Sequence, residues 1–236
     1  AELVSEKYGV SREESDAFAL SSYEKVWNAV ENGKFRDEIV PVEVPVRKGD
    51  PRVFDVDEIP SKKPKTSAEA LAGLRPAFKK DGIVTAGNAS KISDGASALV
   101  VMSRERAEAL GCKPMVRVGA QGASGIDMKY VLVAPILSIP KVLAKDGLEL
   151  ADVDLHEINE AFSTSTVAVR KEIGIDPAKL NVNGGSVALG HPIGASGARV
   201  LTTLIYAMKD RGASVGQASL CLGGGESVTL LVYNEG

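Results

Sequence analysis

The sequence predicts a layered α/β fold built around a mixed β-sheet. From about Gly87 onward, segments typical of strands alternate with segments typical of helices, which favours a sheet covered by helices. Most of these predicted helices end at a glycine, the residue that most often adopts the left-handed conformation after a helix. The last two predicted strands are joined directly by the triple glycine 223–225, so the sheet cannot be wholly parallel.

The first long helix is predicted to begin after Ser11. Ser11 and Glu14 fit a capping box, in which the serine caps the helix and the glutamate reaches back to the serine N–H. We expect this helix to stop just before Gly33. Apolar residues recur at helical spacing in between: Ala19, Tyr23, Val26 and Val30.

Shorter elements are predicted in the rest of the N-terminal part. Residues 37–58 alternate in polarity and are interrupted by prolines, which is typical of short edge strands. Residues 61–74 predict a basic loop that runs into a short helix. We therefore divide the chain into a mostly helical segment with short strands, 1–82, and an α/β core, 83–236.

The core segment predicts an alternating series of strands and helices. The predicted strands are 95–103, 115–121, 154–159, 218–224 and 227–234. The predicted helices are 104–111, 136–147, 161–174 and 196–212.

The composition excludes several classes of protein. The chain has 236 residues, of which 44% are hydrophobic and 25% charged, as in an ordinary globular domain. A formal net charge of −3 argues against a nucleic-acid-binding protein. The sequence contains no run of 18 apolar residues and no recognisable signal peptide, so we expect no membrane span and a cytoplasmic location, with the mitochondrial matrix or a peroxisome as alternatives. The chain lacks an initiator methionine, so we expect that residues precede it.

The cysteines and histidines are too few and too scattered for a disulfide framework or a metal site. The chain has two of each, and their spacing does not resemble a set of metal ligands. We therefore expect no metal, and a reducing compartment. Cys112 follows a predicted helix end and receives no role.

His191 lies in a glycine-rich stretch, "NGGSVALGHPIGASGAR", just before a predicted helix. The flanking glycine lets the backbone turn sharply, and the helix start offers free N–H groups. This setting suits a general base beside a developing anion. The alternative is a loop histidine that only bonds the backbone, and the local pattern does not decide between the two.

Cys221 lies at a strand end immediately before Leu222 and the triple glycine that begins at Gly223. Unobstructed N–H groups of glycines can form an oxyanion hole and can stabilise a nearby thiolate. The alternative, which the spacing alone favours, is a buried strand cysteine behind a hairpin turn.

Asn159 stands at a strand-to-helix junction. Its amide can point into a cleft at the carboxyl end of a strand, where α/β sheets tend to bind ligands. Locally, a helix N-cap is the more common role of such an asparagine. His156, inside the same predicted strand, is expected to be structural.

Together these residues resemble the thiolase family, which makes or cleaves 3-ketoacyl-CoA. The opening "VSEKYGVSREESDAFALSS" is similar to the helical loop domain of that family, so the resemblance covers essentially the whole chain. Four motifs match in family order: residues 75–97, 159–162, 181–199 and 221–225.

The resemblance implies a fold of two similar βαβαβαββ halves with a loop domain inserted in the first. This chain then comprises most of the loop domain, 1–82, and the C-terminal half, 83–236. The expected partner is an N-terminal half that carries the nucleophilic cysteine, without which we expect no activity. The complete unit is expected to be a dimer or tetramer.

The resemblance also implies roles in acyltransferase chemistry. His191 takes the proton of the nucleophile, Cys221 moves the α-proton of acyl-CoA, Asn159 holds a water in one oxyanion hole, and the Gly223 N–H belongs to a second. The substrate is coenzyme A or acyl-CoA, with no covalently bound cofactor. One departure is Ser227, where many relatives have glycine.

Further positions correspond to expected coenzyme A contacts. Ser90 would face the pantetheine arm, Phe78 the adenine end, and Lys63 the phosphates; Ala161 and Phe162 lie in the same motif as Asn159. The alternative function is a non-catalytic subunit that keeps the coenzyme A pocket as a scaffold.

Overall fold

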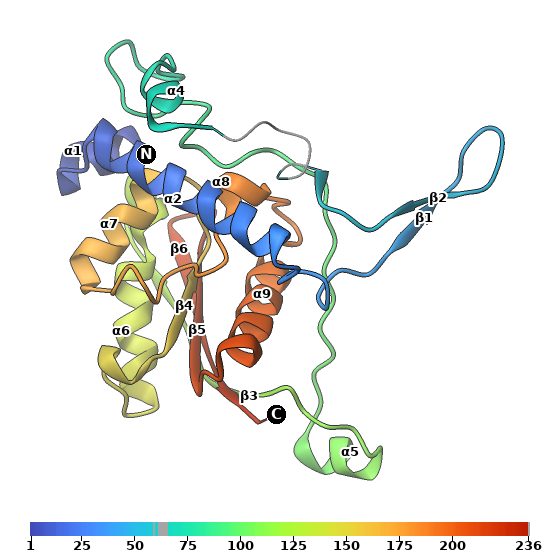
Figure 1. The fold of residues 1–236 in the computed structure, drawn as a ribbon. Helices are drawn as coiled ribbons and strands as arrows, with labels where there is room; N and C mark the ends of the chain where they lie inside the picture. The colour runs from blue at the N-terminus through green and yellow to red at the C-terminus, as the bar shows by residue number, and fades with distance from the viewer. Residues whose placement is uncertain (59, 61–65, 236) are drawn as a thin grey trace.

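A four-stranded mixed sheet lies at the centre of the molecule (Figure 1). The structure is a computed structural model that describes residues 1–58, 60 and 66–235. The sheet order is β3-β6-β5-β4, with β4 parallel to β5 and β6 antiparallel to both β5 and β3. The mixed α/β sheet is thus confirmed. The strands are β3 (Val116–Gly125), β4 (Leu155–Ile158), β5 (Val215–Leu222) and β6 (Glu226–Asn234).

Helices cover both faces of this sheet, which gives the expected layers. α6 (Pro135–Lys145) packs on β3 and β6, with α7 (Ser163–Ile173) beside it. α9 (Ser196–Arg211) packs on β4 and β5 from the other face (Figure 1). Ile139 and Val142 of α6 belong to one hydrophobic cluster. Val200, Leu204 and Met208 of α9 belong to a second one.

Several helix ends follow the glycine pattern in the sequence. Gly174 and Gly212 adopt left-handed conformations after α7 and α9, with φ of 86° and 63°. α5 (Arg104–Ala109) ends two residues before Gly111, whose φ is 65°. Two 3₁₀ turns connect the layers: η1 (Met128–Val133) and η2 (Leu150–Asp152).

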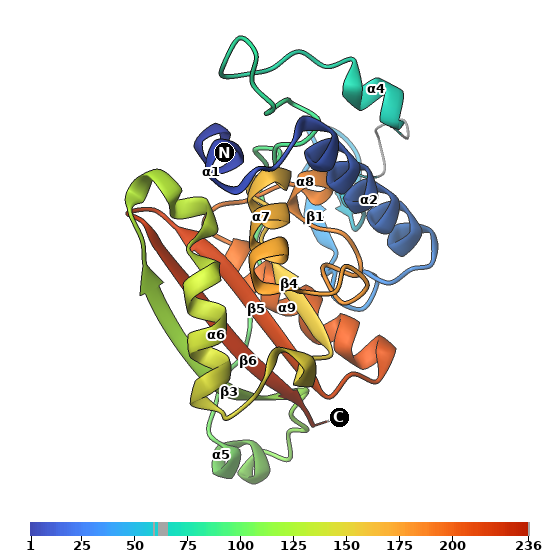
Figure 2. The same cartoon turned by 90° about the vertical axis from the view of Figure 1, so that its left-hand side faces the viewer.

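The N-terminal part forms helices that lie across one end of the sheet (Figure 2). α2 (Arg12–Glu31) begins at the predicted capping box, with both bonds between Ser11 and Glu14 present, and Gly33 follows its end with φ of 66°. α2 packs on α7 and on the short α8 (Ser186–Leu189). α1 (Glu2–Tyr8) precedes it and was not predicted from the pattern.

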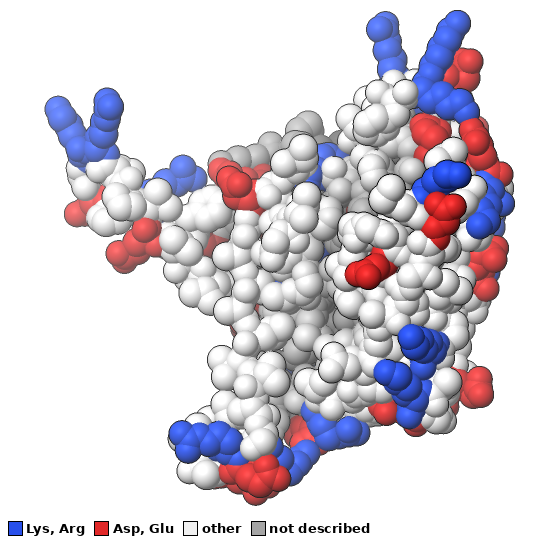
Figure 3. All heavy atoms as spheres, turned by 180° about the vertical axis from the view of Figure 1, so that it is seen from behind, with Lys and Arg blue, Asp and Glu red and all other residues white. Residues whose placement is uncertain are grey.

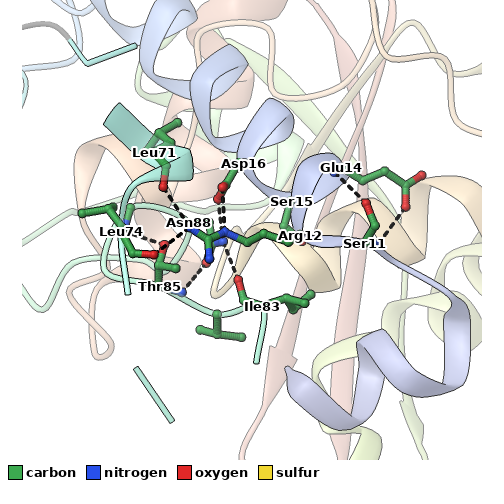
Figure 4. Close-up of polar contacts among 12 residues, drawn as sticks. Ser11, Arg12, Glu14, Ser15, Asp16, Leu71, Leu74, Ile83, Thr85 and Asn88 are labelled. Atoms are coloured by element: carbon green, nitrogen blue, oxygen red, sulfur yellow. Dashed lines mark hydrogen bonds and ion pairs between the residues drawn. The ribbon is translucent and has the colours of Figure 1, made fainter. Parts of the chain in front are cut away.

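Hydrogen bonds attach the start of α2 to residues between 71 and 88 (Figure 4). Arg12 pairs with Asp16 at 2.6 Å and donates to the backbone oxygens of Leu71 and Leu74. Asn88 donates to Asp16 at 2.8 Å and to the Ile83 oxygen at 2.9 Å. These bonds join α2, α4 (Ala68–Ala72) and residues 83–88 into one unit.

The predicted edge strands form a separate two-stranded arm. β1 (Val42–Val44) and β2 (Arg52–Phe54) pair with each other and project from the body (Figure 1). Lys and Arg side chains gather at the tip of the arm (Figure 3).

The strand predicted at 95–103 does not form. These residues run without secondary structure past α9, where Ser97 Oγ lies 3.2 Å from Thr202 Oγ1, and lead to α5 (Figure 1). The side chains of Val100 and Val101 are 86% and 76% exposed. The prediction was wrong because the described sheet offers this segment no strand with which to pair, although its apolar run from Ala98 to Met102 is typical of a buried strand.

Two further features concern residues 1–58, 60 and 66–235. None of their helices is long and apolar enough to cross a bilayer. Within the same residues, no group of three or more His, Cys, Asp or Glu side chains is placed to hold a metal ion. Lys63, an expected phosphate contact, lies outside the described residues.

Candidate active site

Asn159 and Cys221 lie at the carboxyl ends of two adjacent parallel strands. Ile158, the last residue of β4, aligns with Ser219 of β5, and the Asn159 N–H donates to the Ser219 oxygen at 3.0 Å. Cys221 follows two residues farther along β5. Asn159 does not cap a helix, since the N-cap of α7 is Phe162. The Asn159 side chain therefore stays at the strand end, where ligands of α/β sheets usually bind.

Glycine geometry and two hydrogen bonds hold His191 in place. Gly190, with φ of 104°, turns the chain after α8, and the His191 N–H donates to the Lys91 oxygen at 2.8 Å. The imidazole Nδ1 lies 2.5 Å from Ser196 Oγ, and Ser196 donates its own hydroxyl hydrogen to the Pro192 oxygen at 3.0 Å. We assign the hydroxyl hydrogen of Ser196 to the Pro192 oxygen, which makes Nδ1 the donor to Ser196 and leaves Nε2 with a free lone pair.

The surroundings of His191 favour its neutral form. Partial burial, and then the positive charge of Arg199, lower the pKa of the imidazole below its usual value. The ring is thus a neutral imidazole at pH 7 that can accept a proton at Nε2, as a general base must.

Ser186 connects the histidine segment to Asn159. This serine is the first residue of α8, five positions before His191, and its Oγ donates to Asn159 Oδ1 at 2.6 Å. Arg199 Nη2 donates to the same Ser186 Oγ at 2.9 Å. The sequence patterns pointed to no role for Ser186, Ser196 or Arg199. All three lie within the 181–199 motif, which was the available signal.

Cys221 is a half-buried thiol near the end of β5. Burial raises the pKa of the thiol, and a hydrogen bond from its own backbone N–H lowers it by less. The pKa shift favours the protonated thiol over a thiolate beside the glycines, and the role of Cys221 stays a prediction. Ser227 aligns with Cys221 across β5 and β6, and its hydroxyl donates to Ser138 Oγ at 2.9 Å.

Gly223 begins the turn between β5 and β6. Gly224 and Gly225 have φ of 90° and 92°, which other residues rarely adopt. A Cβ on Gly225 would lie 2.4 Å from the Ile126 oxygen, whereas one on Gly223 would meet no atom within 4 Å. The turn thus requires glycine at the later position, and the space beside Gly223 is open.

The expected coenzyme A contacts of the described residues form one group. The Ser90 N–H donates to the Ala161 oxygen at 3.1 Å, and Ala89 forms a β-bridge with Phe162. The rings of Phe78 and Phe162 meet edge to face, 6.5 Å between centroids, and Phe78 is 73% exposed. An exposed aromatic ring of this kind is available to a ligand. These roles stay predictions.

Two buried carboxyl groups, Glu157 and Glu160, and the half-buried Glu38 interact electrostatically with Arg199. Burial raises the pKa of Glu157 to about 8 and that of Glu38 to about 7, and the attraction of Arg199 offsets only part of this. Glu157 Oε1 is 3.5 Å from Arg199 Nη1. Glu160 accepts hydrogen bonds from Ser22 Oγ on α2, Asn181 Nδ2 and the Val187 N–H, so it attaches α2 to the site segments.

Two remaining candidates lie away from this site. His156 is buried, with Nδ1 2.8 Å from Gln217 Oε1 in the core of the sheet, as a structural histidine would be. Cys112 is exposed and precedes β3, whose first residue, Val116, pairs with Asn234. Because Cys221 lies near the opposite end of β6, beside Ser227, the two thiols are at opposite ends of the sheet.

Models of two protein families match the chain. Residues 112–234 match the thiolase C-terminal domain, and residues 1–105 match the thiolase N-terminal domain. The second match extends through the unpaired segment 95–103.

Curated relatives and solved structures agree with these matches. The chain is 52% identical over 232 residues to an acetyl-CoA acetyltransferase of Allochromatium vinosum, which covers 98% of this chain and 58% of that protein. It is 51% identical over 235 residues to one of Pseudomonas aeruginosa, covering 100% of this chain and 59% of the relative. The chain thus spans a little over half the length of these relatives.

Two crystal structures superpose closely on the chain. The Bacillus anthracis acetyl-CoA acetyltransferase gives a TM-score of 0.95 at 46% identity, covering 99% of this chain and 58% of that one. Human mitochondrial 3-ketoacyl-CoA thiolase in complex with CoA gives a TM-score of 0.93 at 38% identity, covering 100% and 58%.

Proposed function

The chain belongs to the thiolase family, and from this we propose that it contributes His191, Cys221 and Asn159 to an acyltransferase acting on acyl-CoA. The observation that carries the proposal is the arrangement at one end of the sheet. Asn159 and Cys221 lie at the carboxyl ends of β4 and β5, and Ser186, five residues before His191, is hydrogen-bonded to the Asn159 amide. The named activities of the relatives support acetyl-CoA and 3-ketoacyl-CoA as the substrate class.

Thiolytic cleavage begins with a cysteine from outside this chain. His191 Nε2 takes its proton, and the thiolate attacks the 3-keto carbon of the substrate. The bond between C2 and C3 breaks, and the Cys221 thiol gives its proton to the departing C2 carbon. A raised thiol pKa serves this step, because it keeps the proton on Cys221 until the carbanion forms.

The second half of the cycle restores both thiols. The Cys221 thiolate takes the proton of a free CoA thiol, and the CoA sulfur attacks the acyl-cysteine. The first cysteine leaves as a thiolate and takes its proton back from the protonated His191. A water held by Asn159, with the protonated His191, stabilises the enolate oxygen, and the Gly223 N–H contributes to the hole for the other oxyanion. Condensation runs the same steps in reverse.

The nucleophile is proposed to lie outside these 236 residues. The sequence holds two cysteines; Cys221 has its own role, and the exposed Cys112 is at the far end of the sheet. The unpaired apolar segment 95–103 and the hollowed, nearly uncharged surface between the arm and the body suit a covering partner segment (Figure 3). That segment is either another part of the same longer polypeptide or a second chain, and His191 has the same role in both cases.

The test is thiolysis of acetoacetyl-CoA by the chain alone and after mixing with the part of the Pseudomonas aeruginosa relative that lies outside the matched region. We expect no activity from the chain alone and measurable activity from the mixture. His191→Ala and Cys221→Ala should each remove at least about a hundredfold of the activity of the mixture. Full activity of the lone chain would contradict the proposed origin of the nucleophile. Tight CoA binding without turnover in the mixture would instead support the scaffold alternative.

A further inference from the structure

We propose that Ser186 is a positioning residue that fixes the Asn159 side chain with its NH₂ group facing the substrate. The inference rests on the proposed function, since it assigns a support to the amide that serves there as an oxyanion donor. It concerns a residue to which the sequence motifs gave no role.

The direction of the hydrogen bonds decides the orientation of the amide. A guanidinium group can only donate, so Arg199 Nη2 must give its hydrogen to Ser186 Oγ, 2.9 Å away. The hydroxyl hydrogen of Ser186 is then available for Asn159, whose nearest side-chain atom, 2.6 Å away, must be the accepting oxygen. Nδ2 therefore points away from Ser186.

Burial makes this orientation hard to reverse. Ser186 has no exposed surface, and Asn159 is 5% exposed. A flipped amide would place Nδ2 opposite the serine hydroxyl, and the buried hydroxyl hydrogen would lose its acceptor, which is unfavourable away from water. Arg199 is in turn held near the buried Glu157 at 3.5 Å, so the donor behind Ser186 stays in place.

Removing the hydroxyl should release the amide without removing it. In Ser186→Ala, Asn159 keeps its donor group but samples the flipped state, so productive orientation is lost part of the time. We expect kcat for thiolysis in the assembled enzyme to fall about tenfold, with KM for the acyl-CoA little changed, because the hydroxyl touches the amide and not the substrate. Ser186→Thr keeps a hydroxyl and should retain kcat.

A double-mutant cycle separates positioning from a general structural role. Asn159→Ala should cost about a hundred- to a thousandfold, and adding Ser186→Ala to it should cost nothing more, because no amide remains to be oriented. The matched control is Ser15→Ala. Ser15 is equally buried and loses a side-chain hydrogen bond, 3.0 Å to Thr164 Oγ1, so it should leave kcat unchanged.

The outcomes separate a failure of the Ser186 role from a failure of the proposed function. Three results would overturn the positioning role while Asn159→Ala is still impaired. The first is a double variant in which the two losses of kcat multiply. The others are a normal kcat in Ser186→Ala and a lost kcat in a folded Ser186→Thr. A fully active Asn159→Ala would overturn both the oxyanion role and the inference. Thermal unfolding of each variant establishes that it is folded.

Discussion

At the scale of single residues, Ser196 determines what His191 can do. With its hydroxyl hydrogen assigned to the Pro192 oxygen, Ser196 accepts from the imidazole Nδ1, and the lone pair of the base is then on Nε2. The tautomer of the histidine is thus set by a neighbour five residues along the chain. The tautomer of His191 can therefore be measured in the isolated chain, without an assay of enzymatic activity.

We predict that His191 in the isolated chain is neutral at pH 7, with its proton on Nδ1. Long-range ¹H–¹⁵N spectra can show this directly, because the chain has two histidines and His156→Gln leaves a single signal set. Ser196→Ala removes the acceptor and should give a mixture of tautomers. An Nε2-protonated ring in the unsubstituted chain would contradict the assignment of the base.

The two thiols should differ in reactivity. The pKa of Cys221 is raised by burial, so little thiolate is present at pH 7, while Cys112 is exposed. We expect iodoacetamide to modify Cys112 at least about tenfold faster than Cys221. Mass spectrometry of the two cysteine-containing peptides measures both rates. Cys112→Ser should leave one slowly reacting thiol. Preferential modification of Cys221 would show a stabilised thiolate and would count against its role as a proton donor in the resting state.

At the scale of elements, close backbone contacts attach α2 to the site. Gly184 has φ of 79°, and a Cβ there would lie 2.5 Å from the Ser22 oxygen on α2. The next glycine, Gly185, gives its N–H to Ser22 Oγ at 3.0 Å. The glycines of the 181–199 motif therefore serve packing as well as the turn before His191.

We predict that Gly184→Ala lowers the free energy of unfolding more than Gly174→Ala does. Both glycines have a left-handed φ, 79° and 86°, so both substitutions bring similar strain of about 1–2 kcal/mol. A Cβ at position 184 also clashes with α2, and overpacking of this kind costs about 1–3 kcal/mol. A Cβ at position 174 meets no atom within 4 Å, so this second cost is absent there. Urea unfolding of the two variants measures the difference. Equal losses would show that α2 can move away without cost.

The buried carboxyl of Glu157 predicts a pH-dependent stability. Its pKa is about 8 when folded, against the ordinary value of 4.5 in an unfolded chain, so between these values the folded state holds a proton that the unfolded state has released. This group therefore lowers the free energy of unfolding as pH rises from about 5 to 8. Glu157→Gln removes that contribution, so its stability relative to the unsubstituted chain should rise over the same interval.

Urea unfolding at pH 5, 6, 7 and 8 tests this, with the exposed Glu172→Gln as the control. Comparing each variant with the unsubstituted chain at every pH cancels the histidines, whose lowered pKa values act in the opposite direction. A constant difference across the four pH values would mean that Glu157 stays ionised beside Arg199.

The sequence predicted what depends on local pattern. The capping box at Ser11 and the glycine ends of the helices follow from neighbours in the chain. The site residues came instead from the resemblance of their motifs to a family, and their roles stay predictions. Contacts between distant side chains were not predictable. Examples are Ser186 with Asn159, 27 positions apart, and Arg199 with Glu157, 42 apart. The strand at 95–103 failed for the same reason, since a strand also requires a partner.

At the scale of the whole molecule, the unpaired segment is the largest departure from a closed fold. Its apolar run is exposed, beside a surface with few charges, and it lies within the part that matches the thiolase N-terminal domain (Figure 3). Exposed apolar segments with unpaired backbone groups favour association. Pairing with further strands would supply both hydrogen bonds and burial.

We predict that residues 98–103 gain protection from hydrogen–deuterium exchange when the complementary part of the Pseudomonas aeruginosa relative is added. Their backbone N–H groups donate to no described residue of this chain, so exchange should be fast alone and slower by at least about a hundredfold once a ladder forms. The β1–β2 arm is the internal control, because its two strands already pair with each other and should show little change. Val100→Lys and Val101→Lys, at positions 86% and 76% exposed, should leave the lone chain folded while weakening both the protection and the recovered thiolysis. Unchanged exchange at 98–103 in a mixture that has regained activity would show that the segment stays outside the completed sheet.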